Sequence, residues 1–332
     1  MTHTRRTGLQ IAVATVVSVT AAWILPQVLE LFALINATVF VSMALLALSL
    51  GLVWGFCGIL CFGQTAFFGL GGYSYAIAAI NFGDTTGAVP IALLVPTLIA
   101  GALGYFMFYG RISDVYMGVI TLTVTLILYK FANSTAGDQW TIGKAALGGF
   151  NGIPGTPPLN LPLQPDQALD PRQVFVLAIM CLLSCYVIAK LALRTRFGRV
   201  AVAIRENEVR AELLGYDVRR HKLGMFVLGG VMAGLAGMLF ANCVFVSPTM
   251  FSLSYAGQVI IWVLVGGVGT LIGPIIGCIL VQMLVTWAGT LPDVDPNLLL
   301  GLVFMLAVLA VPQGLLPAAT EALTRLLRRK AG

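Results

Sequence analysis

Charged residues are scarce in this chain. Lysine, arginine, aspartate and glutamate together make up 10% of its 332 residues. Soluble globular domains are about 25% charged, so this composition excludes a large soluble domain. Hydrophobic residues make up 59% of the chain, and at about 20 residues per span roughly ten membrane-spanning helices fit. The composition therefore predicts an all-α, polytopic membrane protein with a single transmembrane domain over residues 1–332.

The apolar segments also lack groups for ion coupling or catalysis. His3 and His221 lie outside these segments, and Asp114 and Lys130 lie at segment ends. Ion-coupled carriers normally keep charged groups near mid-membrane, and an intramembrane enzyme needs a nucleophile beside a base. The sequence therefore argues against both classes of protein.

Patterns for nucleotides and metals are missing as well. The only Gly-Lys pair, at 143–144, is followed by Ala145, where a phosphate-binding loop needs Ser or Thr. Two cysteine pairs, at 57/61 and 181/185, have helical spacing but no His or acid beside them. Cysteine in such a setting usually packs as a small hydrophobic residue. We expect no catalytic residue, metal site, cofactor or nucleic-acid partner for this chain.

Ten apolar segments are long enough to predict spans. They lie at about 8–29, 31–54, 57–80, 88–109, 115–132, 173–193, 223–244, 256–270, 272–290 and 297–316. Glycine interrupts the segments around 57–80 and 256–290, which leaves their number of spans open. Small residues four apart, such as Gly230 and Gly234, let helix backbones approach closely in lipid. We therefore expect tight helix packing at these rows.

The basic residues predict the orientation. With both termini in the cytoplasm, sixteen of the nineteen lysines and arginines fall on the cytoplasmic side, as the positive-inside rule requires. The segment 133–172 then lies outside, and its many Gly and Pro residues predict an irregular loop with at most a short helix.

The loop 194–222 is the most charged stretch, with eight of the nineteen basic residues. Residues 200–214 can form a helix that Gly215 would end, with Glu206 and Arg210 at the favourable four-residue spacing. Two interpretations stay open at this point: an amphipathic helix that only fixes the topology, or a docking helix for a cytoplasmic partner.

Most polar residues within the spans are neutral. Thr121 and Thr125 share one helix face and are expected to bond a neighbouring backbone. Gln64 follows Gly63 in the glycine-rich run CFGQTAFFGLGGY, and irregular backbone at membrane depth occurs only where it lines a cavity or is buried in protein. Gln64, Thr65, Phe67, Thr121 and Thr125 are therefore candidates for lining a substrate pathway, with structural packing as the alternative.

Three blocks of sequence carry a resemblance to a known family. The first is CGILCFGQTAFFGLGGYSYA (57–76). The second is RTRFGRVAVAIRENEVRAELLGYDVRRHK (194–222), together with the glycine-rich run that follows it and WVLVGGVGTLIGPIIG further on. The third is PQGL (312–315). In this order they resemble the permeases of branched-chain amino acid ABC transporters of the LivM type. The resemblance runs from about residue 40 to residue 316.

The resemblance implies a permease subunit of an ATP-driven importer in the bacterial inner membrane, for branched-chain or other hydrophobic amino acids. It implies a second homologous permease, two cytoplasmic ATPase subunits that carry ATP and Mg, and an external or periplasmic substrate-binding protein. The loop 194–222 would be the coupling element for the ATPase. Its implied contacts are Arg205, Glu206, Asn207, Glu208, Ala211 and Gly215.

Other cargoes and mechanisms stay open at this point. Relatives of such permeases carry urea, short amides or other amino acids, and a stand-alone carrier or channel is a further alternative.

Overall fold

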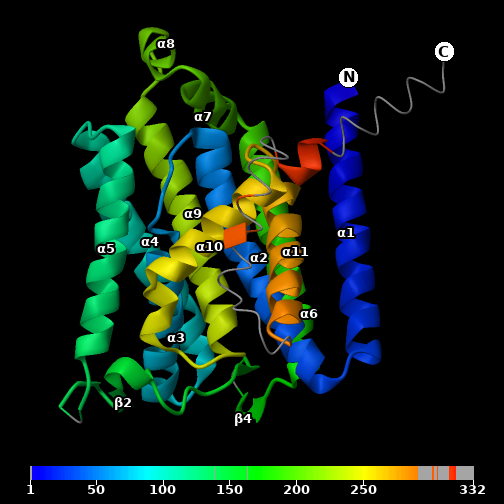
Figure 1. The fold of residues 1–332 in the computed structure, drawn as a ribbon, viewed down its shortest axis with the longest axis vertical. Coiled ribbons are helices and arrows are strands. Elements are labelled where there is room, and N and C mark those ends of the chain that lie inside the picture. Colours follow the sequence, from blue (N-terminus) through cyan, green and yellow to red (C-terminus); the bar gives the residue numbers. More distant parts are fainter. Residues whose placement is uncertain are drawn as a thin grey trace.

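A computed structural model describes residues 2–137, 139–162, 164–290, 301, 302, 305 and 314–318. The chain is mainly helical, with two small antiparallel hairpins (Figure 1). Its elements are α1 (Thr2–Val28), α2 (Leu31–Cys57), α3 (Gln64–Phe82), α4 (Thr85–Tyr109), α5 (Asp114–Ser134), β1 (Thr141–Ile142), β2 (Ala145–Ala146), η1 (Gly149–Asn151), β3 (Asn160–Leu161), β4 (Gln164–Ala168), α6 (Pro171–Arg194), α7 (Arg196–Glu206), α8 (Glu208–Leu213), α9 (Val218–Ala241), η2 (Pro248–Phe251), α10 (Leu253–Gly266) and α11 (Ile272–Ala288).

Six of these helices are long and apolar enough to cross a membrane: α1, α2, α4, α5, α6 and α9. α10 and α11 have 14 and 17 residues, fewer than the roughly 20 that a full span uses. The predicted tenth span, 297–316, lies mostly outside the described residues. The structure is thus a helical membrane protein, and the count of ten spans stays a prediction.

The third predicted span is not one continuous helix. α2 continues to Cys57, the chain is non-helical over 58–63, and α3 begins at Gln64. Gly58 ends α2 with φ +76°, a left-handed conformation that glycine adopts without the steric penalty of a Cβ atom. The prediction of a helix over 57–80 is therefore corrected to a helix that starts seven residues later.

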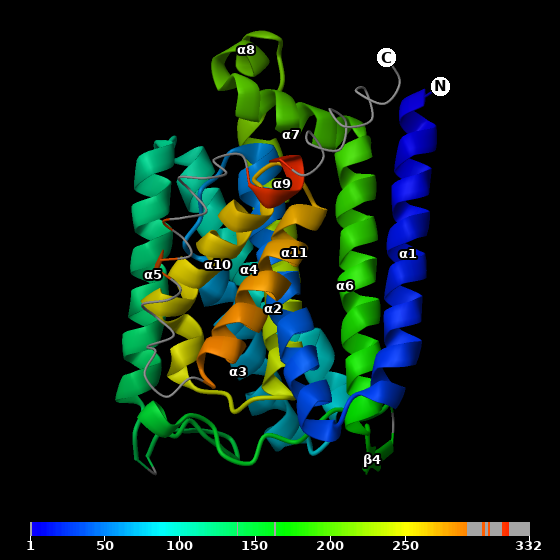
Figure 2. The same cartoon turned by 45° about the vertical axis from the view of Figure 1, so that its right-hand side comes forward.

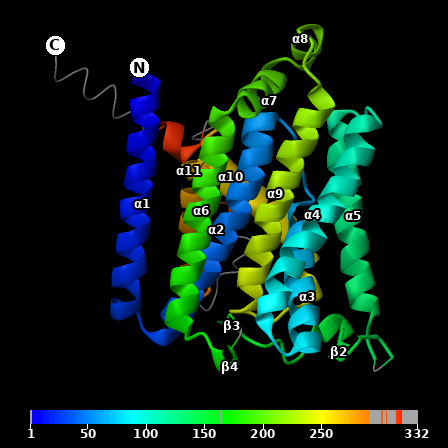
Figure 3. The same ribbon diagram turned by 180° about the vertical axis from the view of Figure 1, so that it is seen from behind.

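Two ends of the bundle can be distinguished. α7, α8 and the start of α1 lie at one end, and the hairpins lie at the other (Figure 1); we call them the α8 end and the hairpin end. α1 stands at the edge of the bundle beside α6 (Figure 2). α9 occupies the centre and packs on α2, α3 and α4 (Figure 3).

Glycines bring α9 into backbone contact with its neighbours. A Cβ atom on Gly237 would overlap the carbonyl oxygen of Phe68 in α3, and one on Gly230 would lie 2.6 Å from the Cβ atom of Ala100 in α4. Helices in lipid associate largely through such close packing of small residues. The predicted tight packing of the glycine rows is therefore confirmed for α9.

The segment between α5 and α6 is more ordered than the predicted irregular loop. It forms the two hairpins and the short helix η1, and side chains fix it to the helix ends. The Oδ1 atom of Asn242 accepts hydrogen bonds from the backbone N–H of Leu159 (2.8 Å) and the hydroxyl of Tyr75 (3.2 Å). Asn160 bonds the backbone N–H of Thr85 (2.9 Å) and the carboxylate of Asp84 (2.8 Å). These hydrogen bonds hold the segment in a fixed position against the ends of the membrane helices.

Candidate functional site

The charged loop forms two short helices, α7 and α8, at the α8 end. The backbone of Asn207 leaves the helical region (φ −161°, ψ 103°), and its side-chain oxygen accepts a 2.9 Å hydrogen bond from the N–H of Arg210. Asparagine is a preferred N-cap because its side chain can satisfy a free N–H in this way. The prediction of one helix over 200–214 is therefore wrong, and Glu206 pairs with Arg205 at 2.5 Å rather than with Arg210.

α8 ends in a tight turn. Gly215 has φ +86°, and the N–H groups of Gly215 and Tyr216 donate to the carbonyls of Glu212 (2.9 Å) and Ala211 (3.2 Å). This pair of bonds is the Schellman motif, in which glycine supplies the left-handed residue. The prediction that Gly215 ends the helix is confirmed.

Four apolar side chains of α8 and the turn that ends it are exposed, and we call them the α8 tip. They are Val209 (66% exposed), Leu213 (83%), Leu214 (71%) and Tyr216 (46%). The α8 tip projects beyond the ends of the membrane helices (Figure 1). An exposed apolar patch bordered by polar residues is typical of a protein-binding surface.

Arg205 connects α7 to the end of α2. Its guanidinium donates a hydrogen bond to the carbonyl oxygen of Gly55, in the last turn of α2, where the helix dipole favours a cation. Its side chain also covers Gly58, because a Cβ atom there would lie 3.0 Å from the Cγ atom of Arg205. Arg205 therefore points toward the membrane helices.

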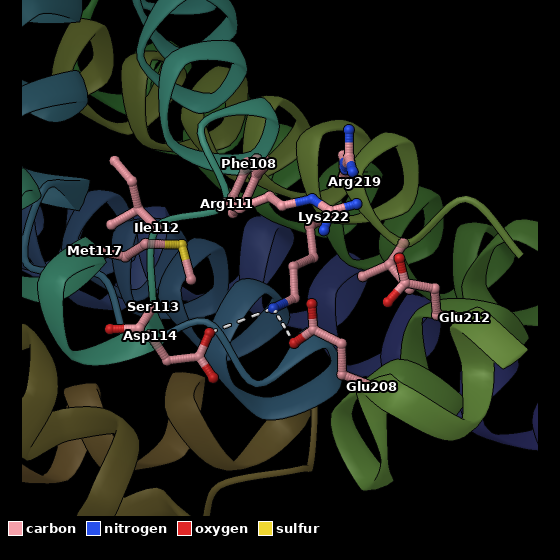
Figure 4. Close-up of a pocket in the computed structure, with 11 residues that line it drawn as sticks. Phe108, Arg111, Ile112, Ser113, Asp114, Met117, Glu208, Glu212, Arg219 and Lys222 are labelled. Atoms are coloured by element: carbon pink, nitrogen blue, oxygen red, sulfur yellow. Dashed lines mark hydrogen bonds and ion pairs between the residues drawn. The ribbon is translucent and has the colours of Figure 1, made fainter.

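Lys222 is a buried cation on α9, with its side chain 7% exposed. Its Nζ atom lies 2.6 Å from the carboxylate of Glu208 in α8 and 3.3 Å from that of Asp114 at the start of α5 (Figure 4). Burying a charge is costly unless the charge is paired, and these two carboxylates supply the pairing. The group, which we call the Lys222 triad, joins three helices beside an open pocket of about 340 Å³.

Ala211 and Glu206 complete the predicted coupling residues. Ala211 is 2% exposed and belongs to a small apolar cluster with Val200, Ile204 and Val218, whereas the side chain of Glu206 is 65% exposed. The six predicted residues therefore lie in α7, in α8 and in the turns next to α8. The outermost surface belongs to the α8 tip, which the prediction did not include.

The non-helical segment 58–63 is held by the predicted pathway threonines. The backbone N–H of Phe62 donates to the hydroxyl of Thr121 at 3.2 Å. The carbonyl of Phe62 accepts from Thr125 and Thr65, each at 3.4 Å. Irregular backbone at membrane depth must find partners within the protein, and these hydroxyls are the partners. The expectation that Thr121 and Thr125 bond a neighbouring backbone is confirmed.

Gln64 and Phe67 begin α3 inside the bundle, where both are 1% exposed or less. The Oε1 atom of Gln64 accepts from Ser49 of α2 at 3.3 Å, and its Nε2 atom has no hydrogen-bond partner among the described residues. Phe67 packs edge-to-face on Phe226 of α9 with ring centroids 5.5 Å apart. The five candidate pathway residues are thus all buried in this conformation.

Two groups were missed from the sequence. The α8 tip had a visible signal, because Leu213 and Leu214 form an apolar pair inside a charged loop. The Lys222 triad had no visible signal in the sequence. Asp114 and Lys222 are 108 residues apart, and each by itself is a charged residue near the end of a predicted span.

Together the fold and the site define a polytopic α-helical membrane protein that carries a charged element with an apolar tip at one end. The profile of the family described as "Branched-chain amino acid transport system / permease component" matches residues 32–311. The chain belongs to this family.

Individual relatives agree with this assignment. The chain is 30% identical over 307 residues to the high-affinity branched-chain amino acid transport system permease protein LivM of Escherichia coli, covering 85% of this chain and 69% of the relative. It is 24% identical over 231 residues to a probable LivM permease of Methanocaldococcus jannaschii, covering 59% and 63%. It is 23% identical over 207 residues to the ribose import permease RbsC of Haemophilus influenzae, covering 59% and 58%. No solved structure matches the chain.

Proposed function

We propose that this chain is the permease subunit of an ATP-driven importer for branched-chain or other hydrophobic amino acids, in the bacterial inner membrane. The observation that supports the proposal is the α7–α8 element, which carries the exposed α8 tip and is attached to the membrane helices through Arg205 and Lys222. The names of the LivM relatives support the cargo. ATP and Mg would be bound by separate ATPase subunits, because the sequence has no phosphate-binding loop.

The α8 tip is the proposed contact with the ATPase. A short helix with exposed apolar residues suits insertion into a groove on a partner, and Glu206 can add a polar contact at its side. Arg205 and Glu208 would transmit force to the membrane helices, since both bond inward. Asn207 and Gly215 would set the shape of α8, and Ala211 would pack it against α7.

The proposed orientation places the α8 end and both termini in the cytoplasm, as the basic residues favour. The hairpin end would then face the outside and receive the substrate-binding protein. Its attachment through Asn160 and Asn242 supports this role, because a pre-organised surface binds without the cost of ordering its loops. A second, homologous permease would complete the membrane part.

The substrate pathway is proposed to form around Gln64 when the helices rearrange. Its buried amide Nε2 has no partner within the part of the chain that the structure describes, which is unusual because buried polar groups are normally hydrogen-bonded. Thr65, Phe67, Thr121 and Thr125 surround the same break in the helix. Gln64→Leu is expected to alter transport of the substrate without reducing ATPase binding; unaltered transport kinetics would remove Gln64 from the pathway.

Affinity purification of the whole complex from the native host tests the docking. Replacing Leu213 and Leu214 by Asp should abolish recovery of the ATPase subunits, because two buried charges would face the groove. Phe150→Asp is a matched control, since Phe150 is 76% exposed at the opposite end. Full ATPase recovery with the double variant would refute the docking surface.

Uptake measurements test the cargo. Deleting the gene should abolish uptake of radiolabelled leucine, isoleucine or valine, and re-expression should restore it. Ribose, urea and short amides serve as competing cargoes, ribose because of the relationship to RbsC. ATP-independent transport by the chain alone in liposomes would instead support a stand-alone carrier or channel.

A further inference from the structure

The Lys222 triad lies where α8, α9 and α5 meet. Lys222 bonds both carboxylates at once, so α8 and α5 are connected here through charges beside an open pocket (Figure 4). Of the three side chains, that of Lys222 on α9 is the buried one. The side chains of Asp114 and Glu208 are partly exposed, so loss of Lys222 would release both carboxylates together without leaving a buried charge unpaired.

α5 carries this contact into the bundle. Asp114 is its first residue, and Thr121 and Thr125 follow seven and eleven residues later. These spacings place all three on one face of the helix, with Thr121 about 10 Å and Thr125 about 16 Å from Asp114 along its axis. One face of α5 therefore bonds the Lys222 triad at the α8 end and the backbone of Phe62 deeper in the bundle.

The far end of this connection is the start of α3. Phe62 lies two residues before Gln64, and Phe62 and Gly63 end the non-helical segment at the helix break. α5 itself stands at the margin of the bundle (Figure 1), and much of its surface is exposed, including Val115, Tyr116 and Ile127. A helix with a free outer surface can shift as a rod without disrupting the core.

We propose that Lys222 is a positioning residue that links α8 to α5, so that a displacement of α8 is delivered along α5 to the segment 58–63 and Gln64. The inference rests on the proposed docking of α8 to an ATPase. A purely local role, in which Lys222 only holds the loop in place, is the competing explanation. The two differ in whether a change at Lys222 is felt at residues 58–66.

Hydrogen exchange of the full chain in lipid nanodiscs separates them. Lys222→Met should raise amide exchange in peptides covering 58–66 by about tenfold, which corresponds to about 1.4 kcal/mol of opening free energy. Lys222→Arg, which keeps the charge, should restore protection. Lys190→Met is the matched control, since Lys190 is a partly buried lysine near the same end of α6 and should leave 58–66 unchanged.

Asp114→Asn gives a milder variant that keeps the Glu208–Lys222 contact, and it should show the same pattern if Lys222→Met does not fold. Three results would each overturn the proposal. The first is a rise in exchange confined to 208–222, the second is no rise at either 58–66 or 208–222, and the third is an equal rise at 58–66 in the Lys190 control.

Coupling in the assembled complex provides the functional readout. The ratio of ATP hydrolysis with loaded binding protein to hydrolysis without it should fall to unity for Lys222→Met and recover for Lys222→Arg. A ratio equal to the wild type in the Met variant would contradict the link. If no ATPase associates with the wild-type chain, the proposed function fails, and the exchange result still decides whether Lys222 acts on 58–66.

Discussion

The bond between Thr121 and Phe62 gives a quantitative prediction for Thr121→Val. Valine keeps the shape of threonine but removes the hydroxyl that accepts the Phe62 N–H. An unpaired buried N–H costs about 1–3 kcal/mol, so we expect this loss in unfolding free energy. Thr125→Val should cost less, below about 1 kcal/mol, because the Phe62 carbonyl still accepts from Thr65 and a net hydrogen bond is worth about that much.

The assay is reversible unfolding of the purified chain in mixed micelles with rising SDS, followed by tryptophan fluorescence. Thr123→Val is the control, because Thr123 lies on the same helix and its hydroxyl bonds only its own helix at Val119, on the exposed side. Changes at exposed sites are usually within about 0.5 kcal/mol. The expected order of destabilisation is therefore Thr121, then Thr125, then Thr123.

Equal losses for Thr121→Val and Thr123→Val would refute the reasoning, since they would mean that Phe62 finds another acceptor or that its N–H is hydrated. A larger loss of unfolding free energy for Thr125→Val than for Thr121→Val would mean that the segment 58–63 is held mainly through the carbonyl of Phe62. The first result would mean that α5 does not hold the segment 58–63, and the second that α5 holds it mainly through Thr125.

Three further predictions concern other parts of the fold. Asn207→Ala should cost α8 about 0.5–2 kcal/mol, seen as faster amide exchange over 208–213. Gly237→Leu should prevent folding, because its side chain would overlap α3, whereas Gly257→Leu has open space at its Cβ position and should fold; recovery of monodisperse protein distinguishes them. Hydrogen bonds from the Thr86 N–H and Asn160 hold the pKa of Asp84 below its ordinary value. A depressed folded-state pKa gives stability that is present above about pH 4 and is lost as pH falls through the folded pKa, so Asp84→Asn should flatten the dependence of thermal stability on pH in that acidic range.

The sequence was most informative where a single local property decides the structure. Hydrophobic length predicted α2, α4, α5, α6 and α9, because lipid requires an uninterrupted helix of a given length. Glycine marked the uncertain region around 57–80, and the break occurs there. The sequence did not place the break at Gly58–Gly63, because helix ends depend on which partners remain for the freed backbone groups.

The same limit applies to the site. The shared face of Thr121 and Thr125 follows from helical spacing, and that they would bond a neighbouring backbone was predictable. The identity of that backbone, Phe62, depends on the packing of α5 beside a segment 59 residues earlier in the chain. Glu206–Arg210 shows the opposite error, since the favourable spacing lost to the capping preference of Asn207.

The difference between the two bonded regions of α5 follows from the cost of charge at each depth. A lysine at the bilayer centre costs about 2.5–3.5 kcal/mol or more, so an ionic link is restricted to the helix ends, where Glu208 and Asp114 remain partly in water. Deeper in the bundle, hydroxyl bonds worth about 0.6–2 kcal/mol are available without that cost. Contacts along α5 follow this order, with charges at Lys222 near the helix end and neutral threonines at Phe62 deeper in the bundle.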